Sequence, residues 1–213
     1  MEEKNIHDEL AAIRSVMERS SKFISLSGLS GVLAGIYALV GAAVAYIAVY
    51  NDAPPYTDNE VVGSGVTHTR DYSFITLELI VVSILVLVAS LVTGFILTRN
   101  KAKRKGQAIW GKLSQSLLFY MAIPLISGGA LIFIFLLRGY YGIVAPASLI
   151  FYGLSLVSAS NFTFTLVKYL GLCEIALGLI AACLPGYGLL FWAIGFGVLH
   201  IIYGSMMYLR YDR

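Results

Sequence analysis

Long apolar runs alternate with short polar stretches along the whole chain. Six of these runs are long enough, or nearly so, to cross a hydrocarbon core of about 30 Å, which takes about 20 helical residues. They lie near residues 24–50, 74–97, 114–137, 143–167, 169–184 and 189–209. The runs are continuous and are not alternating segments of about 10 residues, which argues against a β-barrel. The pattern therefore predicts an all-α polytopic membrane protein, a bundle of six transmembrane helices.

Composition leads to the same class. Hydrophobic residues make up 58% of the chain and charged residues 13%, and the mean hydropathy is +0.80. Such values lie outside the range of ordinary soluble domains. We expect one membrane domain over residues 23–209, preceded by a leader at 1–22 and followed by a short tail at 210–213.

The lysine and arginine residues predict the orientation of the bundle. They precede the first span, join spans two and three, and end the chain, while Lys168 joins spans four and five. The opposite side of the membrane receives only Arg70 and Arg138. The positive-inside rule then places both termini in the cytoplasm.

The leader has the pattern of a short amphipathic helix. Its apolar residues recur at helical spacing, at Ile6, Leu10, Ile13 and Met17. Such a stripe suits a helix that lies on the cytoplasmic leaflet of the lipid bilayer. The alternative is a short seam for self-association, which would make the protein a homo-oligomer.

Polar segments outside the spans suggest few partners. The basic loop Arg99–Lys112 is a candidate site for anionic lipid, although topology alone explains its charge. No nucleic-acid recognition motif accompanies that charge, so we expect no nucleic acid as a partner. The acidic outer loop, residues 51–72, matches no known metal-binding spacing. One membrane histidine without paired cysteines cannot supply a haem or zinc site, so we expect no cofactor.

Glu174 is the residue in these runs that most needs an explanation. A charge at membrane depth costs about 2.5–3.5 kcal/mol by insertion scales, so it normally has a partner or a function. Residues equally far along the chain from the middle of a short turn lie at similar depth on its two helices. For the turn at Pro185–Gly188, the counterpart of residue 174 is residue 199, beside His200. Both residues lie within stripes of glycine, which turn toward other helices and not toward lipid.

The same counting through short turns places other polar side chains at the depth of Glu174. Antiparallel helices joined by short turns bring such positions to the same level. The predicted polar layer contains Glu174, His200, Asn161, Tyr120, Ser30 and Thr93. Glu78 is a separate acidic residue near the outer end of the second span.

Two interpretations of this layer remain open. It is either a hydrogen-bonded plug that sets the register of the helices, or a proton- or cation-linked site of the kind found in relays and transport pathways. Burial in hydrocarbon favours the neutral form of a carboxyl group, so either role starts from a desolvated Glu174.

An enzyme is a further alternative. The segment Gly28–Gly31 reads G-x-S-G, the form found in intramembrane rhomboid proteases, and Ser30, His200 and Glu174 would supply a serine, a histidine and a carboxylate. In that family, however, the serine lies on the fourth core helix, whereas Ser30 lies on the first. We therefore expect no enzyme and no catalytic residues.

The last hairpin resembles a known family. Its glycines and proline stand at Gly171, Gly178, Pro185 and Gly195, followed by His200-Ile-Ile-Tyr-Gly204. This arrangement is similar to the repeated hairpin of HdeD-like acid-resistance membrane proteins. The resemblance implies a six-helix protein of the bacterial inner membrane that is tied to acid stress, and it implies no catalytic residue.

The sequence thus predicts an integral membrane protein with a proton-sensitive polar layer. Transport of an ion or small solute, or a response to acid, is the leading function. The alternative is a structural or accessory subunit, or a homo-oligomer without transport. A cavity that reaches the layer would favour transport, whereas a fully packed core would favour the accessory role.

Overall fold

The computed structural model describes residues 27–51, 72–104 and 110–212, and these form helices and short connections without strands. The predicted leader, most of the outer loop and the centre of the basic loop lie outside the described residues. The main helices are α2 (Gly28–Asn51), α3 (Tyr72–Arg104), α4 (Lys112–Leu137), α5 (Val144–Ala159) and α6 (Thr165–Cys183). The last span consists of α7 (Gly188–Trp192), η2 (Ala193–Leu199), α8 (His200–Met207) and η3 (Tyr208–Asp212), and a 3₁₀ turn, η1 (Tyr141–Ile143), precedes α5.

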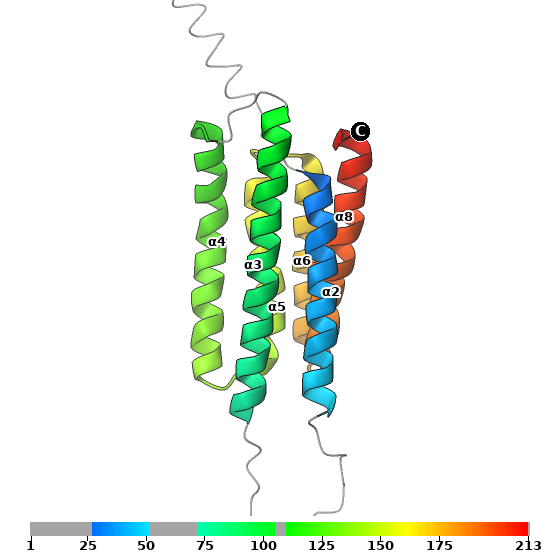
Figure 1. Ribbon diagram of the computed structural model, residues 1–213. Coiled ribbons are helices and arrows are strands. Elements are labelled where there is room, and N and C mark those ends of the chain that lie inside the picture. Colours follow the sequence, from blue (N-terminus) through cyan, green and yellow to red (C-terminus); the bar gives the residue numbers. More distant parts are fainter. Residues whose placement is uncertain (1–26, 52–71, 105–109, 213) are drawn as a thin grey trace, which may run out of the picture.

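Six of the described segments are long and apolar enough to cross a membrane. They run side by side, and the start of α2 lies at the same end of the bundle as the end of the chain (Figure 1). The prediction of an all-α bundle with six membrane spans is confirmed, and the chain is a multi-pass membrane protein.

The bounds of the fourth and fifth spans differ from the prediction. The sequence suggested a break near Lys168, but α5 ends at Ala159 and α6 begins at Thr165. Side-chain oxygens make the earlier turn: Ser160 Oγ donates to the carbonyl of Val157 at 2.6 Å, and Thr163 Oγ1 donates to that of Ala159 at 3.1 Å. Such local bonds compete with regular helix. The prediction failed because the turn is followed directly by apolar residues, which extended the apparent span.

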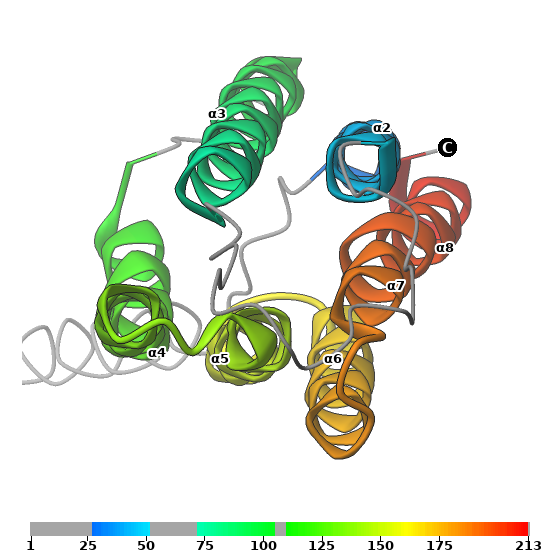
Figure 2. The ribbon, with the colours of Figure 1, turned by 90° about the horizontal axis from the view of Figure 1, so that it is seen from below.

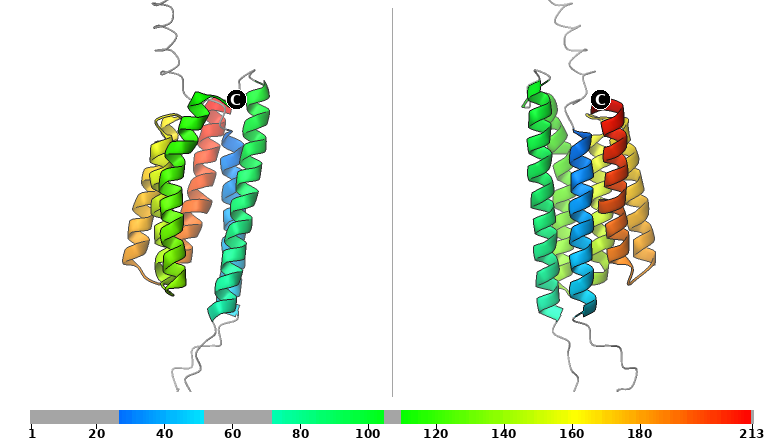
Figure 3. Two further views of the ribbon diagram at one scale, coloured as in Figure 1. Left: turned by 90° about the vertical axis from the view of Figure 1, so that its left-hand side faces the viewer. Right: turned by 45° about the vertical axis from the view of Figure 1, so that its right-hand side comes forward.

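The helices form two closely packed groups. In one, α5 packs against α4 and α6; in the other, α2 packs against α3 and the last span. Seen from below, α3 lies beside α2 and apart from α4 and α5 (Figure 2). Two further views show the same placement of α3 (Figure 3). Among the described residues, α3 packs closely against α2 and against no other helix to a comparable extent.

Glycines allow the helix backbones to approach one another within each group. A β-carbon built on Gly35 would lie 2.6 Å from the carbonyl oxygen of Gly197, and one built on Gly153 would lie 2.6 Å from that of Gly171. Small residues at such crossings replace side-chain packing with direct backbone contact. The glycine stripes seen in the sequence are therefore the contact faces of the bundle.

The last span changes helix type in its middle. Residues 193–199 of η2 form a π-helix between the α-helical segments α7 and α8. Insertions of π-helix are rare and occur frequently at functional sites. This one carries Gly195 and Gly197, both buried, and ends directly before His200.

Candidate functional site

Glu174 lies in the middle of α6 and is fully buried, with 0% of its surface exposed. Neither of its carboxyl oxygens has a hydrogen-bond partner among the described residues. It lies beside His200, whose Nδ1 is 3.5 Å from Oε1. The structure therefore brings together the two residues that the sequence paired.

His200 is held by hydrogen bonds at both ring nitrogens. Nδ1 lies 3.0 Å from the carbonyl oxygen of Gly195, and Nε2 lies 2.8 Å from the hydroxyl of Tyr152. A carbonyl oxygen only accepts, so the neutral ring carries its hydrogen on Nδ1, and Nε2 accepts from Tyr152. The imidazole thus bonds to the hydroxyl of Tyr152 on α5 and lies beside the carboxyl of Glu174 on α6 without a hydrogen bond to it.

Tyr152 was missed by the sequence analysis. The turn between α5 and α6 is centred at residue 162, so the residue on α5 at the same depth as Glu174 is residue 150. Tyr152 is only two positions from it. The signal available was the polar stretch Ser158–Asn161, which marks the turn. We call Tyr152, His200 and Glu174 the polar triad.

Two aromatic side chains of the last span, Phe196 and Trp192, pack beside this triad. Phe196 lies between Trp192 and the triad, with its ring centroid 5.1 Å from that of Trp192 and 5.0 Å from that of Tyr152. The rings of Phe196 and His200 stack at 6.0 Å. Aromatic pairs in this distance range stabilise one another and stiffen their surroundings.

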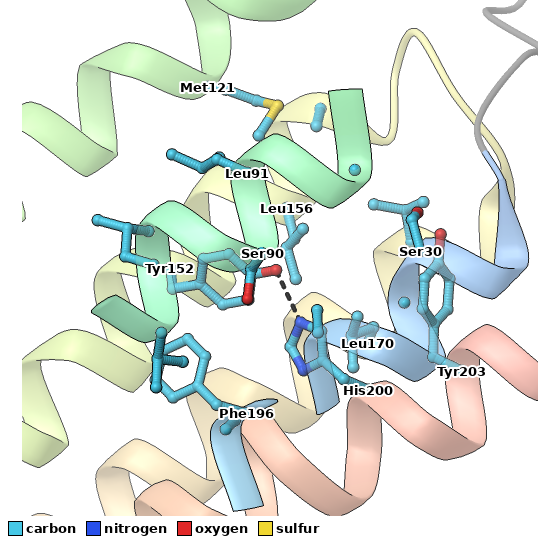
Figure 4. Close-up of a pocket in the computed structure, with 18 of the residues that line it drawn as sticks. Ser30, Ser90, Leu91, Met121, Tyr152, Leu156, Leu170, Phe196, His200 and Tyr203 are labelled. Carbon is cyan, nitrogen blue, oxygen red and sulfur yellow. Dashed lines mark hydrogen bonds between the residues drawn. The ribbon is translucent and has the colours of Figure 1, made fainter. Parts of the chain in front are cut away.

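A cavity of about 480 Å³ lies between the two helix groups and reaches the triad (Figure 4). Tyr152 and His200 line it, whereas Glu174 lies behind His200 and is not part of the lining. The wall is mainly apolar, and the described residues that form it include no Asp, Glu, Lys or Arg. Its size falls in the range of small-molecule sites, about 300–1,000 Å³.

Three other residues singled out from the sequence, Ser30, Thr93 and Glu78, form no hydrogen bond with the polar triad. Ser30 lines the same cavity, but its hydroxyl donates to the carbonyl of Ser27 at 2.6 Å. Thr93 lies between α2 and α3, with its hydroxyl 3.3 Å from that of Tyr37. Glu78 is exposed on α3, near the end of the bundle opposite the C-terminus.

The prediction that Asn161 and Tyr120 belong to the buried layer is wrong. Asn161 is exposed in the turn between α5 and α6, where its amide donates to the carbonyl of Ser158 at 3.3 Å. Tyr120 is 49% exposed and stacks on Phe162 in the same turn, with ring centroids 5.2 Å apart. Both errors follow from the misplaced turn, which put Asn161 too deep and carried Tyr120 with it.

The arrangement does not form a serine–histidine dyad. Both nitrogens of His200 bond to groups other than Ser30, and the hydroxyl of Ser30 bonds within its own helix. Within the described parts of the chain, no three His, Cys, Asp or Glu side chains lie close enough to hold a metal ion.

The chemistry left to the triad is hydrogen bonding and proton exchange. His200 can give or take a proton at both nitrogens, and it adjoins a carboxyl group on one side and a cavity on the other. No family model, curated protein or solved structure matches the chain. Inference about function therefore rests on this geometry.

Proposed function

We propose that this membrane protein responds to protons through its polar triad and binds or passes a small solute in the adjoining cavity. The observation that carries the proposal is the position of Glu174, a fully buried carboxyl whose Oε1 lies 3.5 Å from Nδ1 of His200. Ionisable residues inside a membrane bundle are costly and mark ion, proton or substrate sites by default.

The proton content of the pair determines its net charge. Glu174 and His200 together carry no net charge when they hold one titratable proton, either as acid and imidazole or as carboxylate and imidazolium. A second proton leaves a positive charge in the core, and removal of the shared proton leaves a negative one. Because an uncompensated buried charge costs about 3–5 kcal/mol, the stability of the bundle depends on pH at both limits.

Few other groups contribute charge at this position. Among the described residues on the helices packed around α6, Tyr152 bonds to His200, and Tyr203 follows one turn later on α8, where its hydroxyl donates to Met207 Sδ. Lys168 lies on α6 itself but is exposed. The pH response is therefore assigned to Glu174 and His200.

The location of the protein belongs to the same proposal. The distribution of lysine and arginine supports an orientation with both termini in the cytoplasm, and the inner membrane is proposed from the resemblance of the last hairpin. The resemblance of the last hairpin to HdeD-like proteins supports a role in acid stress. We propose a binding or transport protein and not an enzyme.

A structural role for the triad is the second candidate. It is favoured by the tight seat of the carboxyl group, since a β-carbon at Gly195 would lie 2.5 Å from Oε2 of Glu174. In that case the triad sets the register of α5, α6 and α8, and its proton content has no consequence for function.

The experiment that separates the two roles replaces the acid by an isostere. Interhelical polar contacts in membranes contribute about 0.6 kcal/mol on average, so Glu174→Gln should leave the bundle folded. The proposal expects a wild-type protein whose thermal stability, or solute flux in liposomes, changes between about pH 5 and pH 8. Glu174→Gln and His200→Gln should each abolish this change.

The double variant and a surface control complete the test. Because the two residues act as a unit, Glu174→Gln with His200→Gln should be no worse than either single variant. Glu78→Gln removes an exposed acid from α3 and should leave the pH response intact. Additive effects of the single variants, or a wild type without pH dependence, would contradict the proposal and leave the structural role.

A further inference from the structure

The wall of the cavity excludes charged ligands. Among the residues that the structure describes, its only titratable side chains are Tyr152, His200 and Tyr203, and the rest of the described lining is apolar apart from small hydroxyls and Trp192. A charged molecule inside it would lose its hydration without gaining an ion pair, which is a costly transfer. The cavity therefore suits an uncharged molecule.

The cavity is long in the direction of the helices. Along α3 its lining extends from Ser83 to Gly94, about 16.5 Å at the rise of an α-helix. Leucine, valine and methionine side chains from α3, α4, α5 and α6 form the larger apolar part of the remaining wall, and α2 adds small residues. A slender apolar molecule fits this shape better than a compact polar one.

One side of the cavity faces the least packed part of the bundle. Leu91 on α3 and Met121 on α4 both line it (Figure 4), and Leu91 is 64% exposed. The described residues show no close packing between α3 and α4. Because these helices span the membrane, this is the side from which a molecule dissolved in the bilayer would enter the cavity.

Polar groups in the wall provide a hydrogen-bonding end. The hydroxyl of Ser90 lines the cavity and forms no hydrogen bond with any described residue. The hydroxyl of Tyr152 donates to His200, which leaves its oxygen able to accept a further bond. A ligand hydroxyl suits both groups, since it donates and accepts.

From these observations we infer that the cavity binds an uncharged, lipid-soluble molecule with a slender apolar body and a hydroxyl group, taken up from the bilayer between α3 and α4. The inference rests on the proposed function in one respect: it identifies this molecule as the small solute that the protein binds or passes. Binding itself does not require Glu174 and His200 to exchange protons, so the two proposals can fail separately.

The chain offers a fluorescent reporter for this site. It has two tryptophans, Trp110 and Trp192, and Trp192 lines the cavity while Trp110 is exposed. In a Trp110→Phe protein, Trp192 is the only tryptophan, and bromine quenches its emission on contact. The probe is 12-bromododecan-1-ol, added to the full chain in detergent. We expect saturable quenching that unbrominated dodecan-1-ol reverses.

Two further probes test the chemical class. 1-Bromododecane lacks the hydroxyl and should bind roughly threefold to tenfold more weakly, as expected for the loss of a hydrogen bond. The 12-bromododecanoate anion carries a charge and should give no saturable quenching. In the Ser90→Ala protein the advantage of the alcohol over the bromoalkane should shrink.

A filled cavity provides the decisive variant. Gly94 lines the cavity, and a β-carbon built there meets no atom within 4 Å, so Gly94→Phe fills the space without a clash at its first atom. Gly129 on α4 has the same free surroundings but lies outside the lining, so Gly129→Phe is the matched control. We expect Gly94→Phe to abolish saturable quenching and Gly129→Phe to retain it.

The outcomes separate the two proposals. Quenching that is not saturable, or is equal for the alcohol and the bromoalkane, or survives Gly94→Phe in a folded protein, would overturn the inferred site. If Gly94→Phe does not fold, the competition by dodecan-1-ol and the Ser90→Ala comparison still decide. Binding that persists while the wild type shows no pH dependence would remove the proton role and keep the site.

Discussion

The α-carbon of Gly195 packs against the carboxyl group of Glu174, so that a β-carbon at position 195 would lie 2.5 Å from Oε2. The carbonyl oxygen of the same glycine lies 3.0 Å from Nδ1 of His200. One residue of the π-helix thus makes room for the acid and orients the imidazole. This double role accounts for a glycine in the middle of a membrane span.

Substitution of Gly195 by alanine should therefore disturb the triad directly. The added methyl group would meet Glu174 Oε2 and Leu149 Cδ2, both at 2.5 Å. Overpacking of this kind costs about 1–3 kcal/mol. We expect Gly195→Ala to lower the thermal stability in detergent, whereas Gly129→Ala, with nothing within 4 Å, should not lower it. Equal stability of the two variants would show that Gly195 is not confined as described.

The hydroxyl of Tyr152 should matter more for the pH response than for stability. Tyr152→Phe removes the 2.8 Å bond to His200 Nε2, at a cost of about 0.6 kcal/mol, the average for such contacts in membranes. Without that bond the ring nitrogen takes up protons differently, so the pH midpoint of the stability curve should move. Tyr169→Phe on the exposed face of α6 is the control. An unchanged midpoint in Tyr152→Phe would contradict its role as the partner of His200.

The contact between α2 and the last span should tolerate no side chain at Gly35. A β-carbon there would lie 2.6 Å from the carbonyl oxygen of Gly197 and 2.7 Å from Ile201 Cγ1. Because one of these atoms belongs to a backbone, Gly35→Ala should separate the helices and lower stability by about 1–3 kcal/mol. Gly94→Ala, which meets no atom within 4 Å, is the matched control in unfolding measurements. Similar unfolding of the two variants would argue against this contact.

The orientation in the membrane can be tested by labelling. The positive-inside rule expects Ser64 outside the cytoplasm and Gln107 inside it. In a background with Cys173 and Cys183 replaced by alanine, Ser64→Cys should react with an impermeant maleimide in intact spheroplasts. Gln107→Cys should react only after the membrane is opened. The reverse pattern would overturn the predicted topology.

The apolar pattern of the sequence determined the architecture. Runs of about 20 apolar residues cannot remain in water and cannot cross lipid except as helices, so their number predicts the spans. The glycine stripes predicted the contact faces for a similar reason, since only small residues allow backbones to approach this closely. The pairing of Glu174 with His200 followed from depth, because the turn at Pro185–Gly188 is short and clearly marked, and from the glycine stripes that turn both residues inward.

The tertiary structure decided which residues share a site. Residue counting gives depth along one axis, but contact also depends on the rotation of each helix and on which helices are neighbours. Asn161 and Tyr120 were misplaced because side-chain hydrogen bonds end α5 before the apolar run ends. The cavity exists because α3 packs on α2 and stands apart from α4. No local pattern encodes that gap, since the free energy that sets it is the sum of contacts between helices distant in sequence.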